Sequence, residues 1–152
     1  MERIFRFPIK VGKESIDVLG HTNNKEYLRW MEEAALAHLD SLGWTMDRYL
    51  GIGKVFVAST HKIEYLRPTF EGDELTMLTW VETMDGAKSR RCFYLKRDNK
   101  VCMQGWTEWT FVDLQTGRAA DISAEVKKNF PLVPPDDPDL KASGVRRSPS
   151  QA

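Results

Sequence analysis

The clearest pattern in the chain is a run of apolar residues at helical spacing in its first third. These residues recur as they do on one face of an α-helix: Tyr27, Trp30, Met31, Ala34, Ala35, His38, Leu39 and Leu42. Asn23 followed by Glu26 is typical of a capping-box start, and Gly43 is a typical helix end. The spacing therefore predicts a helix over residues 24–42, roughly 28 Å long at about 1.5 Å per residue.

The segments on either side of this helix are rich in residues that favour strands, with apolar and polar positions alternating. Residues 3–11 predict a first strand, and Pro8 places it at a sheet edge or a bulge because proline donates no ladder hydrogen bond. Further strands are predicted at 55–66, 74–84, 88–96 and 101–112. Residues 123–130 predict a short helix that is capped by Ser123.

The last hairpin is predicted to turn at residues 98–99 with a two-residue loop. This register sets Cys92 opposite Gly105 and Cys102 opposite Leu95, which keeps the sulfurs out of bonding distance and predicts reduced, half-buried thiols. In the final strand, alternate residues are expected on one face: Val101, Met103, Gly105, Thr107, Trp109 and Phe111.

The order of these elements predicts an α+β fold, in which an antiparallel sheet of about five strands wraps one long helix. Such a sheet leaves an edge uncovered, so we expect a second copy of the chain to associate with it. This domain is expected over residues 1–130. Residues 131–152 contain five of the seven prolines, and they predict an extended or disordered tail.

Composition narrows the possible functions. Among the 152 residues, Lys and Arg number 22, as do Asp and Glu, so the formal net charge is zero and no nucleic-acid partner is expected. No apolar stretch is long enough to span a bilayer and no signal-peptide pattern is present, so we expect a cytoplasmic protein without a membrane partner. The two cysteines lack the spacing of a metal site, and no metal is expected.

Residues 17–30 carry the candidate chemistry. Asp17 lies in a loop seven residues before the first helical position, and Gly20 allows a tight bend between them. With Asn23 as the N-cap, the backbone N–H of Asn24 is an unpaired donor at the positive end of the helix dipole. A carboxylate beside such a donor suits acyl transfer, in which negative charge develops on a carbonyl oxygen. Taken alone, Asp17 is more typical of a turn.

The motif D-x-x-G-H-x-N-N-x-x-Y-x-x-W, which begins at Asp17, resembles the signature of 4-hydroxybenzoyl-CoA thioesterase-like hotdog proteins. Residues 65–68, 72–73, 109–113 and 116–118 resemble the later strands of that family, so the resemblance covers residues 3–130. It implies a hotdog fold and hydrolysis of an acyl-CoA thioester to a free acid and coenzyme A. It also implies a homodimer or homotetramer that needs no metal or organic cofactor.

The same resemblance assigns roles to residues of the motif. Asp17 would attack the thioester carbonyl or activate a water molecule to do so, and the Asn24 amide would polarise the carbonyl oxygen. His21, Asn23 and Tyr27 would shape the pocket and orient Asp17 or the substrate. The position of Tyr27 on the apolar stripe also predicts packing in the core.

Two positions depart from related sequences. Leu19 stands where plant-type acyl-carrier-protein thioesterases have an asparagine, which favours the aspartate mechanism here. Ala35 stands where many relatives have arginine, so no Glu–Arg pair is expected at that point of the helix. An acyl-carrier-protein substrate and a non-catalytic acyl-CoA-binding role stay open as alternatives, and the sequence does not specify the acyl group.

Further candidates lie outside the motif. Lys88, Arg90 and Arg91 form a basic cluster that suits the phosphates of coenzyme A, although a solvent-facing strand start explains it equally well. His61 lies in the middle of a predicted strand, where it either lines the acyl or pantetheine channel or faces solvent. His38 lies on the apolar stripe and is expected to be packed and hydrogen-bonded.

Overall fold

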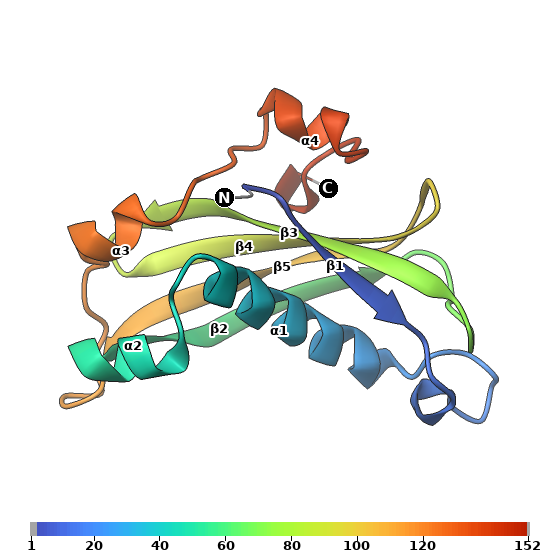
Figure 1. Cartoon of the computed structure of the whole chain (residues 1–152), viewed down its shortest axis with the longest axis horizontal. Helices are drawn as coiled ribbons and strands as arrows, with labels where there is room; N and C mark the ends of the chain where they lie inside the picture. Colours follow the sequence, from blue (N-terminus) through green and yellow to red (C-terminus); the bar gives the residue numbers. More distant parts are fainter. Residues whose placement is uncertain (1–2, 152) are drawn as a thin grey trace.

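An antiparallel sheet with one helix across its face forms the core of the computed structural model, which describes residues 3–151 (Figure 1). The sheet has the strand order β1-β3-β4-β5-β2. Its strands are β1 (Phe5–Lys10), β2 (Lys54–Tyr65), β3 (Glu74–Asp85), β4 (Lys88–Arg97) and β5 (Lys100–Asp113). The helices are α1 (Asn24–Ser41), α2 (Met46–Ile52), α3 (Ala124–Lys128) and α4 (Pro138–Ala142), with 3-10 turns η1 (Lys13–Ser15) and η2 (Pro149–Gln151). This arrangement confirms the predicted α+β class with a five-stranded antiparallel sheet.

The predicted strand positions agree closely with the structure. β1 lies at one edge of the sheet and pairs only with β3, which confirms the edge position that Pro8 indicates. The predicted short helix near residue 123 is also present, because the Ser123 side chain accepts a hydrogen bond from Val126 N at 3.3 Å. Local signals of this kind act over a few residues, so they can be read directly from the sequence.

The apolar stripe of α1 packs against one face of the sheet. Its members Tyr27, Trp30, Met31, Ala34 and Ala35 are at most 3% exposed. They form one hydrophobic cluster with sheet residues that include Met77, Phe93, Leu95 and Met103. This burial holds α1 in place, and it sets the position of the helix N-terminus relative to the strand ends.

The register of the last hairpin differs from the prediction. Leu95 is opposite Met103, and a β-bulge lies between Leu95 and Lys96, so that Cys102 is an extra residue in β5. The bulge reverses the alternation of side chains before Met103. Val101 consequently packs with the cluster on the outer face of the sheet, whereas Met103 packs with α1 on the inner face. The prediction that both residues share one face is wrong for this reason.

The same shift sets Cys92 opposite Trp106 rather than Gly105. Cys92 packs in the outer cluster and Cys102 in the inner one, so the two sulfurs lie on opposite faces of the sheet. Both cysteines are free, as predicted, but they are fully buried rather than half-buried. Burial raises the pKa of the Cys92 thiol to about 12, which keeps it protonated and unreactive at neutral pH.

Helix α2 was not predicted from the sequence, although local signals for it are present. The side chain of Thr45 caps it by accepting a hydrogen bond from Arg48 N at 3.3 Å, and Gly53 ends it with a φ of +74°. Trp44 and Tyr49 pack with Phe111 in a second cluster near the C-terminal end of α1. Because the helix has only seven residues, its apolar period is too short to stand out.

The prediction of an extended or disordered tail after residue 130 is wrong. Residues 131–151 fold over the face of the sheet opposite α1 and include α4 (Figure 1). Val133, Leu140 and Val145 are at most 2% exposed. They pack in the outer cluster with sheet residues that include Leu78, Trp80 and Tyr94. Residues 131–151 therefore belong to the same folded unit as residues 3–130.

Polar contacts also attach this C-terminal segment to the sheet. The hydroxyls of Ser148 and Ser150 donate to Oε1 of buried Glu82 at 2.8 and 2.7 Å. Arg3 forms ion pairs with Asp137 and Asp139 of the segment. The proline content of the segment indicated disorder, but its few apolar and hydroxyl side chains find partners that are far away in the sequence.

Over residues 3–151, no helix has both the length and the apolar character needed to cross a membrane.

The outer cluster predicts how the C-terminal segment contributes to stability. Leu140→Ala removes a side chain that is 2% exposed and should lower the free energy of unfolding by about 2–5 kcal/mol. Leu132→Ala, in the same segment but 41% exposed, is the matched control and should change it by about 0.5 kcal/mol or less. Denaturant titration measures both variants, and equal effects would contradict the packing of the segment on the sheet.

Candidate functional site

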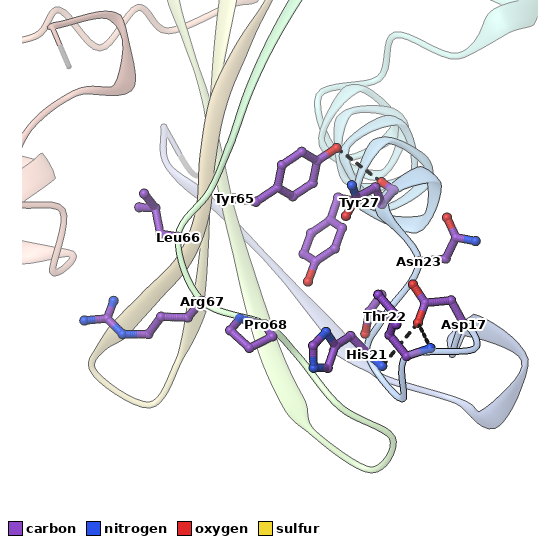
Figure 2. A pocket seen from close by; sticks show the side chains of 11 residues that line it. Asp17, His21, Thr22, Asn23, Tyr27, Tyr65, Leu66, Arg67 and Pro68 are labelled. Carbon is purple, nitrogen blue, oxygen red and sulfur yellow. Dashed lines mark hydrogen bonds between the residues drawn. The ribbon is translucent and has the colours of Figure 1, made fainter.

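A pocket of about 460 Å³ lies between the loop that precedes α1 and the end of β2 (Figure 2). We call it the Asp17 pocket. The structure brings together here all the candidates from the N-terminal motif: Asp17, His21, Asn23, Asn24 and Tyr27. Tyr65 and Arg67 line it from the chain segment at the end of β2, although the guanidinium of Arg67 points away from Asp17.

The Asp17 side chain is part of a turn and also lines the pocket. Its Oδ1 atom accepts hydrogen bonds from Leu19 N at 2.9 Å and His21 N at 3.4 Å. Gly20 closes the turn with a φ of +81°, a backbone conformation that favours glycine. Within residues 3–151, the Oδ2 atom of Asp17 makes no hydrogen bond. The turn therefore orients the carboxylate through one oxygen and leaves the other oxygen without a partner in the described residues.

The start of α1 provides a hydrogen-bond donor in the same pocket. Asn23 is the N-cap, as predicted, and its Oδ1 accepts from Lys25 N at 3.1 Å. The N–H of Asn24, the first helical residue, has no hydrogen-bond partner among residues 3–151. The carbonyl oxygen of Asn24 accepts a 3.4 Å hydrogen bond from the Tyr65 hydroxyl, which links the helix start to β2 (Figure 2).

The reciprocal bond that completes a capping box is not formed. The backbone N–H of Asn23 donates instead to Ser15 O at 2.8 Å. The Glu26 carboxylate accepts from Arg29 Nε at 2.9 Å and from the Ser15 hydroxyl at 2.7 Å. These two contacts, with that of Arg29 the stronger, lower the pKa of Glu26. Glu26 thus stays ionised and attaches the loop before Asp17 to the first turn of α1.

Tyr27 is a core residue whose hydroxyl belongs to a buried network. The network joins Tyr27, Thr69 and Thr22, with oxygens 3.0 and 2.7 Å apart. Thr22 donates to Thr69 O and Thr69 donates to Thr22, so the Tyr27 hydroxyl must donate to Thr69. Burial raises the pKa of Tyr27, which keeps this proton in place. Thr69 had no local signal in the sequence, because its partners lie over forty residues away.

The structure does not bring His61 into this pocket. His61 lies in β2, and its Nδ1 atom is 2.8 Å from the Thr107 hydroxyl of β5. His61 is exposed, which agrees with the interpretation of a solvent-facing strand position, and it does not line the Asp17 pocket.

Lys88 and Arg90 are also far from the pocket. Lys88 is in register with Thr110 of β5, which pairs with Val57 of β2. Tyr65 lies eight residues further along β2, about 26 Å away at roughly 3.3 Å per residue. Arg90 is in register with Glu108 and so with Thr60, five residues from Tyr65 or about 17 Å. Within one chain, Lys88 and Arg90 therefore lie away from the Asp17 pocket. Lys88 contacts the Thr110 hydroxyl at 3.0 Å, and the Arg90 guanidinium stacks 3.9 Å from the centre of the Trp106 ring.

Arg91 is buried, so the surface position that both interpretations assumed, a phosphate-binding rim or a solvent-facing strand start, is wrong for this residue. It is 3% exposed and points to the α1 side of the sheet. Its Nη1 donates to His38 Nδ1 at 2.9 Å and to the Thr79 hydroxyl at 3.1 Å. Since β4 alternates, Arg91 faces the core while its neighbour Arg90 faces outward. His38 is buried and hydrogen-bonded, as predicted.

Among residues 3–151, no three His, Cys, Asp or Glu side chains are grouped so that they could hold a metal ion. The Asp17 pocket offers a carboxylate, from Asp17, and a backbone N–H donor, from Asn24.

Comparisons with known proteins identify the family whose model matches this chain. The model of the thioesterase-like superfamily matches residues 11–130, which include every residue of the Asp17 pocket. The long-chain acyl-CoA thioesterase FadM of Escherichia coli (strain K12) is 27% identical over 127 residues. That alignment covers 80% of this chain and 93% of FadM.

Solved structures share the fold. YbaW, a probable thioesterase from Escherichia coli, has a TM-score of 0.72 at 24% identity, covering 82% of this chain and 95% of its own. Slr0204, a 1,4-dihydroxy-2-naphthoyl-CoA thioesterase from Synechocystis, has a TM-score of 0.76 at 14% identity, covering 83% and 94%. These similarities support the hotdog arrangement that the motif implies.

Proposed function

The chain belongs to the thioesterase-like superfamily, and we propose that it hydrolyses an acyl-CoA thioester to a free acid and coenzyme A. One observation carries the proposal: an Asp17 carboxylate oxygen and the Asn24 N–H, both without a partner in residues 3–151, line the same pocket. The sequence similarity to FadM, a long-chain acyl-CoA thioesterase, supports the same substrate class.

The geometry supports two versions of the reaction at Asp17. In the first, Oδ2 attacks the thioester carbonyl carbon and the C–S bond breaks, which leaves an acyl-aspartyl anhydride that water then hydrolyses. In the second, Oδ2 takes a proton from water, and the resulting hydroxide attacks the same carbon. Both versions release a thiolate, which is a good leaving group and needs no strong general acid.

The N-terminus of α1 would stabilise the transition state in both versions. Negative charge develops on the thioester carbonyl oxygen during attack, and the Asn24 N–H would donate to that oxygen. The dipole of an 18-residue helix adds to the favourable field at this end. His21 would act as a positioning residue, because its backbone N–H holds Oδ1 of Asp17.

Asp17→Asn should lower kcat for acyl-CoA hydrolysis by at least about a hundredfold, since the amide neither attacks nor takes a proton. The Asn side chain keeps an oxygen to accept from Leu19 N, so the turn should be preserved. Thiol release from acyl-CoA measures the rate, and a denaturation curve checks the fold. Undiminished turnover in a folded variant would exclude Asp17 from catalysis, and tight binding without turnover in the wild type would favour a binding module.

Asn24→Pro tests the backbone donor separately. Proline is well tolerated at the first helical position, and it removes the N–H without breaking the helix. Asn23 has φ −62° and ψ 136°, a conformation that is compatible with a following proline. We expect kcat to fall by about 10²–10³-fold. The matched control Asn24→Ala keeps the N–H and should keep most of the activity, so equal rates in the two variants would contradict the role of the amide.

We also propose that two copies of the chain associate through β2. This strand is the second edge of the sheet, and residues 57–62 are all exposed. An edge strand of 12 residues presents a row of unpaired backbone groups, which a second copy satisfies in antiparallel pairing about a twofold axis.

The double substitution Val57→Lys and Thr60→Lys should convert a dimer to a monomer, because like charges would meet across the twofold axis. The control places two lysines in an exposed loop, at Leu114 and Gln115, and should leave the dimer intact. Light scattering during size-exclusion chromatography measures the mass. A wild-type monomer, or a dimer that survives the β2 substitutions, would contradict the proposed interface.

A further inference from the structure

A second pocket of about 410 Å³ lies between the C-terminal half of α1, helix α2 and the sheet. We call it the Arg91 pocket. Its apolar lining includes Leu36, Leu39, Trp44, Phe56 and Trp109. None of the residues that line it in the described part of the chain also lines the Asp17 pocket, which lies at the other end of α1. It has the size and the predominantly apolar lining of a small-molecule site.

The guanidinium of Arg91 is a buried positive charge in this pocket. No carboxylate of residues 3–151 forms an ion pair with it, and its Nη1 bonds go to His38 and Thr79. Arginine only donates, so Nδ1 of His38 must be the acceptor in that contact and Thr79 is uncharged. Burial lowers the pKa of Arg91 to about 10, which still leaves it cationic at neutral pH. A buried charge without a counter-ion is costly, so the site favours an anion.

Other polar groups around the pocket lack partners too. The indole nitrogens of Trp44 and Trp109 and the hydroxyl of Tyr49 are buried and make no hydrogen bond within residues 3–151. All three side chains line the pocket. Buried donors without acceptors are uncommon in native proteins, and a ligand with acceptor oxygens would satisfy them. Glu32 and Asp40 also line the pocket, but both are exposed, so solvent screens their charges.

We propose that the Arg91 pocket binds an apolar monocarboxylate, such as a free fatty acid. The carboxylate would pair with the Arg91 guanidinium and accept from one of the unpartnered donors, while the hydrocarbon chain packs against Leu36, Leu39 and Phe56. Within one chain this site is separate from the Asp17 pocket, and it does not depend on hydrolysis. If the proposed function is correct, the ligand is of the same chemical class as its acid product.

Calorimetric titration of the full chain with decanoate, and with decanol as the uncharged probe of equal length, tests the proposal. We expect decanoate to bind at least about tenfold more tightly than decanol at neutral pH, because decanol cannot pair with a buried charge. Arg91→Gln keeps a donor for His38 but loses the charge, and it should abolish the preference for decanoate. Equal affinities for the two probes in the wild type, or no binding of decanoate, would overturn the proposal.

A second pair of variants locates the binding site even where Arg91→Gln does not fold. Leu36 lines the Arg91 pocket and is 54% exposed. In Leu36→Trp the larger side chain fills part of the pocket, and it should weaken decanoate binding about tenfold or more. Leu66→Trp makes the same substitution in the Asp17 pocket at a residue that is 45% exposed, and it should leave the affinity unchanged. The opposite result would place decanoate in the Asp17 pocket and overturn the proposal. Because no thioester is present, a failure here is independent of the tests of hydrolysis.

Discussion

The packing of α1 against the sheet positions both candidate sites of the molecule. Five side chains of its apolar stripe are almost completely buried, and each large one contributes roughly 1.5–3 kcal/mol relative to exposure. The burial of this face fixes the positions of both ends of the helix. Its N-terminus lies beside the Asp17 turn and the end of β2, and its C-terminal half forms one wall of the Arg91 pocket. Both candidate sites therefore rest on the same buried helix.

In the loop before α1, one residue holds a turn and also carries the proposed chemistry. Asp17 lines the pocket and uses one carboxylate oxygen to hold its turn, while the other has no partner in residues 3–151. The two interpretations of this residue, turn former and reactive carboxylate, are therefore compatible. The contacts of Ser15 with Asn23 and Glu26 then fix the loop to the first turn of the helix. In the proposed reaction, a carboxylate held in this way would need little reorganisation.

Arg91 shows how a charge is kept inside the core. Alternation along β4 turns it inward, where Thr79 and His38 bind one of its nitrogens but neither neutralises it. A hydrophobic residue of similar volume often makes a core at least as stable as a buried charge does. An arginine at the wall of a cavity with unpartnered donors is thus better explained by the proposed ligand than by stability.

Features that depend on near neighbours along the chain could be predicted from the order of the residues. The period of the apolar residues located α1, Asn23 marked its start, Pro8 indicated an edge strand, and the motif from Asp17 indicated the pocket that those residues line. Three features could not be predicted in this way: the bulge at Cys102, the folding of the C-terminal segment over the sheet and the inward position of Arg91. Each of these depends on contacts between residues far apart in the chain. Periodicity and capping report local preference, whereas register and burial are settled by which distant side chains fill the same space.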